Sequence, residues 1–263
     1  MLELDYIMKH TLKKHNRGVK AEELKKITKG GNIYYNSVNL LCGRQGSGKS
    51  FTSMKEIIIA TEEKPSHLVI CICKDENSED PTVKALERLV SCDVVYIGEN
   101  NAEDYVRNIL LWKKFYNEVK DNKLEKKIDE DQKQECFENL HIKNFDKPFL
   151  HTILLFNDIA KSKLLNNPTN YFNQLIPICR HIQTSFFLCV QFWKSVPTEI
   201  KANTTTAFIF GGFSRQQLFY ILSQLPITLD KNLIYQRYID LNKNDKIVVD
   251  CETGEAIVDL RQI

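Results

Sequence analysis

The sequence predicts an α/β fold in which helices cover both sides of a mostly parallel sheet. The first observation is a series of short, nearly all-apolar runs, such as 67–73 and 185–190, which are typical of strands buried on both faces. The second is that segments with helical spacing of apolar residues separate these runs, and alternating strands and helices form parallel sheets. The third is a glycine-rich loop at 43–50 that follows one apolar run and precedes a helix-like segment. A chain of 263 residues accommodates one main domain with small additions.

The composition is that of an ordinary globular protein. Apolar residues make up 43% of the chain and charged residues 27%, and no apolar run approaches the ~20 residues that a membrane-spanning helix needs. The first residues lack the cationic head and apolar core of a secretion signal. The eight cysteines never form a C-x-x-C pair and fall mostly in apolar runs, which favours buried thiols over a metal site. We therefore expect a soluble protein of a reducing compartment, without stable membrane insertion.

Residues 1–31 are predicted to form a basic helical arm. They contain eight Lys or Arg residues against four acidic ones. Such an arm suits contact with the phosphate backbone of a nucleic acid, but charge runs are more often simply the solvated face of a helix. The net charge of +2 does not by itself indicate a nucleic-acid partner.

The glycine-rich loop at 43–50 matches the phosphate-binding pattern G-x-x-x-x-G-K-[ST] without a mismatch. An apolar strand is predicted at 38–42 before it and a helix at 51–61 after it. The backbone N–H groups of such a loop wrap an anion, and the helix N-terminus adds its positive end. The lysine reaches the terminal phosphates and the serine hydroxyl ligates Mg²⁺. We therefore expect ATP and Mg²⁺ as ligands, the alternative being a flexible glycine loop that matches by chance. The residues predicted to bind the nucleotide are Gly43, Arg44, Gln45, Gly46, Ser47, Gly48, Lys49, Ser50 and Phe51.

Strands and helices alternate downstream of the loop. Strands are predicted at 67–73 and 94–97, with a helix at 81–90 between them. The next helix is long, and its apolar stripe repeats every three or four residues through Tyr105, Ile109, Trp112, Tyr116 and Val119. The highly charged stretch from about 120 to 147 is predicted to be a partly helical surface insertion.

The second half of the chain continues the alternation. An apolar strand at 151–156 precedes a helix that we expect Asn167 and Pro168 to start and Pro177 to shorten. The remaining predicted elements are, in order, strands at 185–190 and 207–210, helices at 214–224 and about 230–241, and a hairpin with strands at 247–250 and 256–260. This pattern divides the chain into an N-terminal arm (1–31), an ATPase-like core (32–225) and a C-terminal helix with a β-hairpin (226–263).

Polar residues follow two of the buried strands and are predicted to face the glycine loop. Asn157 and Asp158 come after the strand at 151–156, and Gln191 follows the strand at 185–190. Because parallel strands end at the edge of the sheet where the loop lies, these side chains should reach a bound nucleotide. An acid there serves Mg²⁺ or orients water, and a neutral amide senses the γ-phosphate. The alternative for Asp158 is an exposed turn acid.

Together these features resemble the FtsK–HerA superfamily of P-loop ATPases, most closely the poxvirus-type branch of viral DNA-packaging ATPases. The resemblance covers roughly residues 35–225. The features that carry it are the loop at 43–50, the apolar strand ending in Asn157 and Asp158, the pair Arg180 and His181 before a strand, and Gln191 followed by Pro197 and Asn203.

The resemblance implies a three-layer P-loop ATPase with core strand order 5-1-4-3-2. Members of the family work as rings, here a pentamer or hexamer, around double-stranded DNA and push the genome into a capsid. The implied partners are therefore double-stranded DNA, further copies of the chain, and capsid or portal-vertex proteins. The implied location is the virion or the host cytoplasm at the site of viral assembly.

The resemblance also implies roles for single residues. The implied catalytic residues are Lys49, Asp158 as base, Gln191 as sensor and Arg180 as an arginine finger, and the implied metal ligands are Ser50, Asn157 and Asp158. Because Arg180 precedes its strand, it lies at the sheet edge opposite its own loop and would act in the neighbouring subunit. The alternative for Arg180 is a surface ion pair, and Arg215 is a second candidate for the finger.

One departure from the family concerns the acids at 157 and 158. The family usually has two adjacent acids there, whereas this chain has Asn157 in the first place. An amide can still bond a magnesium-bound water but adds no negative charge, so Asp158 would carry both roles or hydrolysis would be slow. Asp75 and Glu76, after a neighbouring strand, are candidates for a displaced general base. The alternative function is therefore a nucleotide-binding switch or assembly protein with weak hydrolysis.

Overall fold

The computed structural model describes residues 34–62, 67–74, 81–121, 151–157, 164 and 170–259. The predicted N-terminal arm and the predicted insertion from 122 onward lie outside the described residues. So do Asp75, Glu76 and Asp158. Within the described ranges, no helix is long and apolar enough to cross a membrane.

A single mixed sheet forms the centre of the described chain. Its eight strands are arranged in the order β3-β2-β4-β5-β1-β6-β7-β8. All pairs from β3 to β6 are parallel, and the last two strands add an antiparallel hairpin to β6. The strands are β1 (Val38–Cys42), β2 (His67–Cys73), β3 (Asp93–Gly98), β4 (His151–Phe156), β5 (Thr184–Val190), β6 (Thr206–Phe210), β7 (Lys246–Asp250) and β8 (Ala256–Asp259).

The strand order confirms the fold that the sequence predicts. The succession β6-β1-β5-β4-β2 is the expected 5-1-4-3-2 core, and β3 is an additional strand outside β2. β5 lies between β1 and β4, as expected for a strand that carries a sensor between the glycine loop and the acid-bearing strand. The C-terminal ends of these three parallel strands therefore meet at one edge of the sheet.

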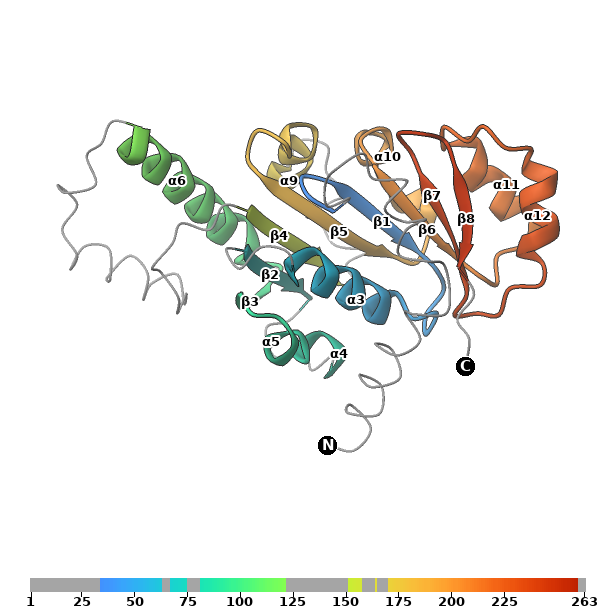
Figure 1. Cartoon of the computed structure of the whole chain (residues 1–263), viewed down its shortest axis with the longest axis horizontal. Helices are drawn as coiled ribbons and strands as arrows, with labels where there is room; N and C mark the ends of the chain where they lie inside the picture. The colour runs from blue at the N-terminus through green and yellow to red at the C-terminus, as the bar shows by residue number, and fades with distance from the viewer. Residues whose placement is uncertain are drawn as a thin grey trace.

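Helices cover both faces of the sheet. In Figure 1, α3, α4 and α5 lie below the strands, and α11 and α12 lie at the far end beside β7 and β8. The helices are α3 (Lys49–Glu62), α4 (Pro81–Lys84), α5 (Leu86–Leu89), α6 (Ala102–Asp121), α9 (Tyr171–Leu175), α10 (Thr198–Ala202), α11 (Arg215–Ser223) and α12 (Lys231–Tyr238), with 3-10 turns η2 (Ile176–Ile178) and η3 (Trp193–Ser195).

Two apolar cores separate the three layers. Along β1 the side chains alternate, so Leu40 belongs to one core and Leu41 to the other, and both are fully buried. Ile57 of α3 packs in the core of one face, and Ile109 of α6 and Leu218 of α11 pack in that of the other. Burial of both faces explains why the strands appear in the sequence as unbroken apolar runs.

The helix predicted at 81–90 is instead two short helices. Ala85 keeps helical dihedral angles (φ −67°, ψ −22°), but the N–H of Arg88 bonds the carbonyl of Ala85, a spacing of three residues. The chain therefore tightens locally to a 3-10 turn and loses the regular α-helical bonds there.

The helix predicted to start at Asn167 and Pro168 begins at Tyr171. Its cap is Asn170, whose Oδ1 accepts a hydrogen bond from the N–H of Phe172 at 3.0 Å. Asn167 and Pro168 lie outside the described residues. Pro177 shortens the helix as expected, because the α-helix ends at Leu175 and continues only as η2.

A buried lysine fixes α6 across the N-terminal ends of β4 and β5. The ammonium of Lys113 donates to the carbonyls of Ile182 at 2.6 Å and Gln183 at 3.1 Å, and lies 3.5 Å from Thr152 Oγ1. Burial lowers the pKa of Lys113 to about 7. The three oxygen acceptors satisfy the ammonium group, but its removal from water makes its charge unfavourable.

Lys113→Met tests this buried charge. Since burial lowers the pKa of Lys113 from 10.5 to about 7, the unfolded chain binds more protons than the folded chain between these two values. The free energy of unfolding of the wild type should therefore rise, relative to that of Lys113→Met, by about 1 to 2 kcal/mol from pH 7 to pH 8.5. Urea unfolding of both proteins at both pH values measures this, and the comparison cancels the other groups, which both proteins share. A difference that stays constant with pH would contradict it.

Candidate functional site

The glycine loop at 43–50 joins β1 directly to α3. Gly46 and Gly48 have positive φ angles of 70° and 88°, which residues with a side chain rarely adopt. Gly43 has no room for a Cβ, because one would collide with Ser47 Oγ and come within 2.8 Å of Phe210 Cβ. The N–H of Thr52 bonds the carbonyl of Gly48 at 2.8 Å, so the helix begins within the loop. The glycines are therefore required by the loop's own geometry.

Lys49 lies across the loop with its side chain buried. Its ammonium donates to the carbonyls of Gly43 at 2.8 Å and Arg44 at 3.0 Å. This position puts a positive charge within the turn whose backbone would wrap a phosphate.

Ser50, in the first turn of α3, meets the end of β4. Its hydroxyl donates to Oδ1 of Asn157 at 2.9 Å, and the N–H of Asn157 bonds the carbonyl of Ile72 on β2 at 3.1 Å. Two of the three predicted metal ligands therefore lie in direct contact. Hydroxyl and amide oxygens are the kind of donors that Mg²⁺ takes, although both are neutral. The third predicted ligand, Asp158, lies outside the described residues.

Gln191 follows β5 at the same edge of the sheet. The N–H of Gly43 bonds the carbonyl of Val190 at 3.1 Å, which ties the start of the glycine loop to the residue before Gln191. Since β5 separates β1 from β4, the chain at Gln191 lies between the loop and Asn157. The structure thus brings the loop, Asn157 and Gln191 together.

Cys42, the last residue of β1, is not set up as a nucleophile. Burial raises the pKa of its thiol to about 12, and the charge of Lys49 only partly offsets this. The thiol therefore stays protonated at neutral pH and fills space in the core.

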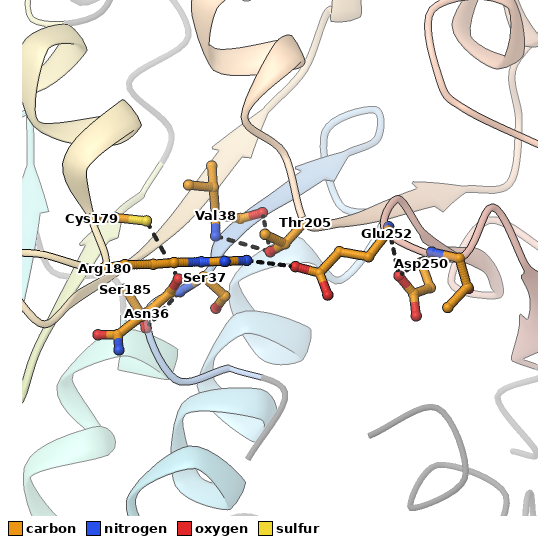
Figure 2. A network of polar contacts seen from close by, with 10 residues as sticks. Asn36, Ser37, Val38, Cys179, Arg180, Ser185, Thr205, Asp250 and Glu252 are labelled. Carbon is orange, nitrogen blue, oxygen red and sulfur yellow. Dashed lines mark hydrogen bonds and ion pairs between the residues drawn. The ribbon is translucent and has the colours of Figure 1, made fainter. Parts of the chain in front are cut away.

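Arg180 lies at the opposite edge of the sheet. It occupies the turn before β5, and the length of that strand, roughly 20 Å, separates it from Gln191. Its guanidinium pairs with Glu252 at 2.8 Å, and the two side chains are 72% and 62% exposed. Figure 2 shows Arg180 reaching across this edge to Glu252, in the turn between β7 and β8. The structure therefore contains the surface ion pair that the sequence left as the alternative for Arg180.

Arg215, the second candidate finger, is the first residue of α11. Its guanidinium lies 5.2 Å from the ring centroids of both Phe219 and Tyr235. It also contacts Oδ1 of Asn232 at 3.4 Å. These contacts hold the side chain against α11 and α12 of its own chain.

Sequence reasoning missed one segment at the site, the turn at 242–245. The N–H of Gly211 bonds the carbonyl of Asp245 at 2.9 Å, and a Cβ on Gly211 would collide with the carbonyl oxygen of Asn242. The turn therefore packs against the end of β6, beside the glycine loop. Its Asn-Lys-Asn-Asp sequence signals a turn, but only the tertiary packing brings Lys243 near Gly46.

Comparison with known proteins shows what this fold is similar to. No protein-family model matches the chain, and no curated protein matches it either. The genome packaging NTPase of Sulfolobus turreted icosahedral virus 2, in complex with AMP, is 12% identical; the match covers 86% of this chain and 98% of that one, with a TM-score of 0.56. The DNA-packaging ATPase from Sulfolobus Turreted Icosahedral Virus is also 12% identical over 88% and 100% of the two chains, with a TM-score of 0.54.

A third structure is the cytoplasmic domain of the Type VII secretion ATPase EccC from Thermomonospora curvata. It is 13% identical, and the match covers 85% of this chain but 25% of that one, with a TM-score of 0.51. At such identities the likeness is one of fold. At that level, it agrees with the three-layer α/β fold that the sequence predicts.

Proposed function

We propose that this chain hydrolyses ATP to translocate double-stranded DNA and package a viral genome. The observation that carries the proposal is the 2.9 Å contact between Ser50 Oγ and Asn157 Oδ1, which joins the glycine loop to the end of β4. It is supported by a fold shared with two viral packaging enzymes. The proposed partners are double-stranded DNA, further copies of the chain in a ring, and capsid or portal-vertex proteins at the viral assembly site.

Each residue at the loop would have its own role in phosphoryl transfer. The backbone of 43–50 binds the phosphates, and Lys49 exchanges its two carbonyl acceptors for phosphate oxygens. Ser50 and Asn157 would hold Mg²⁺, which supplies positive charge to the phosphates when bound. Asp158 serves as the base that orients or deprotonates water, and Gln191 contacts the γ-phosphate from the end of β5.

Arg180 is proposed to act on the nucleotide of a neighbouring subunit. The length of β5 separates it from its own loop, so it cannot reach the nucleotide that its own chain binds. Its ion pair with Glu252 is largely exposed, and exposed pairs contribute about 0–1 kcal/mol. A phosphate on an adjacent subunit can therefore replace Glu252 as the partner of Arg180.

A second candidate function is a nucleotide-binding switch or assembly protein with weak hydrolysis. Asn157 favours it, because the oxygen that contacts Ser50 belongs to a neutral amide instead of a carboxylate. A neutral ligand neutralises less of the charge on Mg²⁺ and cannot serve as a base.

Measurement of ATP turnover with and without long duplex DNA tests the motor. We expect turnover that duplex DNA stimulates and that Lys49→Ala lowers by about 100-fold or more, because the alanine removes the cation that reaches the phosphates. Lys84→Ala, which removes an exposed lysine from α4, is the matched control. Absence of turnover under both conditions would rule the motor out.

Asn157→Asp separates the two candidate functions. For a motor, the added carboxylate should strengthen Mg²⁺ binding next to Ser50 and raise turnover by about 10-fold. Asn157→Ala, which removes the oxygen altogether, should lower the turnover and raise the Mg²⁺ concentration that it requires. A switch protein predicts instead tight ATP binding that Asn157→Asp leaves unchanged, with negligible turnover.

Mixing two inactive variants tests the action of Arg180 between subunits. The Lys49→Ala variant still carries Arg180, and the Arg180→Ala variant still carries an intact loop. In a mixed ring, some interfaces therefore combine an intact loop from one variant with Arg180 from the other. We expect each variant alone to lose about 100-fold or more in turnover, and the mixture to recover part of it. Glu252→Ala, which removes only the ion-pair partner, should retain turnover. An Arg180→Ala protein as active as the wild type would leave Arg180 with a surface role only.

A further inference from the structure

We propose that Lys243 binds the phosphates of a nucleotide held in the loop at 43–50, so that a turn near the C-terminal end of the same chain completes one side of the nucleotide site. This rests on the proposed nucleotide binding and names a residue that the loop pattern does not contain. Lys243 belongs to the turn at 242–245, which joins α12 to β7.

The position of Lys243 places its ammonium over the middle of the loop. A Cβ built on Gly46 would lie 3.0 Å from Lys243 Nζ and 3.8 Å from its Cε. Gly46 is in the stretch whose backbone N–H groups wrap the phosphate in loops of this pattern. The side chain of Lys243 is otherwise exposed, and no carboxylate among the described residues forms an ion pair with it.

The turn that carries Lys243 is closed by its own hydrogen bonds. The N–H of Asn242 bonds Oδ2 of Asp245 at 2.8 Å, and the N–H of Asp245 bonds the carbonyl of Asn242 at 3.1 Å. Asp245 is only 3% exposed, and its carbonyl accepts the N–H of Gly211 at 2.9 Å. The backbone of Lys243 is therefore fixed relative to the end of β6, the strand that pairs with β1.

α12 holds the turn against the same strand end from the other side. The buried hydroxyl of Tyr238 donates to the carbonyl of Phe210 at 2.6 Å and accepts the N–H of Phe213 at 2.9 Å. Burial raises the pKa of Tyr238 to about 12, so the hydroxyl stays neutral and keeps donating. The segment leading into the turn is thus anchored at the residues that flank Gly211 and Gly212.

The chemistry of lysine suits a phosphate partner at this place. An ammonium on a flexible stem is a compact point charge, and it bonds phosphate oxygens by charge-assisted hydrogen bonds. Such bonds are among the stronger contacts of a binding site, and loss of one weakens binding by about 10-fold or more. A lysine that only stabilised the loop would instead do so in the absence of nucleotide as well.

Binding of ATPγS, ADP and adenosine to the full chain tests the proposal. Lys243→Gln should weaken ATPγS and ADP by about 10-fold or more, and should leave adenosine within about 2-fold, because only the phosphates carry charge. Lys243→Arg should restore most of the affinity. Asn244→Ala, in the same turn, is the matched control and should bind all three ligands like the wild type. The loss in Lys243→Gln should shrink at high salt.

The outcomes separate this inference from the proposed function. If Lys49→Ala abolishes ATPγS binding and Lys243→Gln does not change it, Lys243 is not a phosphate ligand and the proposed function stands. A loss of affinity that is equal for all three ligands and independent of salt would mean that Lys243 only stabilises the loop, and it would overturn the inference. If the wild type binds no ATPγS, the proposed function fails, and the inference fails with it.

Discussion

The site depends on the parallel register of β4, β5 and β1. Cys42 of β1 pairs with Val190 of β5, and the next residues along these two strands are Gly43 and Gln191. The end of β4, which carries Asn157, pairs with β5 in the same direction. A slip of one residue would turn every side chain of a strand to the opposite face, into a core that is packed around other side chains. The packing of the two apolar cores therefore sets the distances at the polar edge.

Most of the fold follows from the sequence because strands buried on both faces leave unbroken apolar runs. Their order was expected from the resemblance, and the pairing of the strands confirms it. The short elements η3 and α10 were missed, since three to five residues show no usable periodicity. Within the site, the sequence singled out Asn157 and Gln191 because both end apolar strands. The sequence does not reveal Lys243, because its approach to Gly46 depends on how α12 packs. Nor does it reveal that Glu252 pairs with Arg180, because these two residues lie far apart along the chain.

The ion pair of Arg180 is weak because both side chains are exposed to water. Arg180 can therefore form a surface ion pair in its own chain and still serve as an arginine finger for another. Water competes for both exposed groups, so the contact with Glu252 contributes little to the stability of the fold. The guanidinium is nevertheless kept at the N-terminal end of β5, away from its own loop. A weak partner on the same chain and a stronger, doubly charged partner on another chain are compatible, because the first is easily exchanged for the second. A surface ion pair in one chain is therefore no argument against a role between chains.

Asn157 and Lys243 shift the charge of the site in the same direction. The oxygen of Asn157 beside Ser50 carries no net charge, and Lys243 places a positive charge beside Gly46. Under the proposed function, Lys243 would add attraction for the phosphates, whereas the neutral Asn157 would hold Mg²⁺ less strongly than a carboxylate does. Tighter binding of the substrate alone does not speed its hydrolysis, since only contacts that strengthen in the transition state lower the barrier. Under the proposed function, an isolated chain should therefore turn its nucleotide over slowly. Under the proposed function, Arg180 of a neighbouring subunit would supply the contact that strengthens in the transition state.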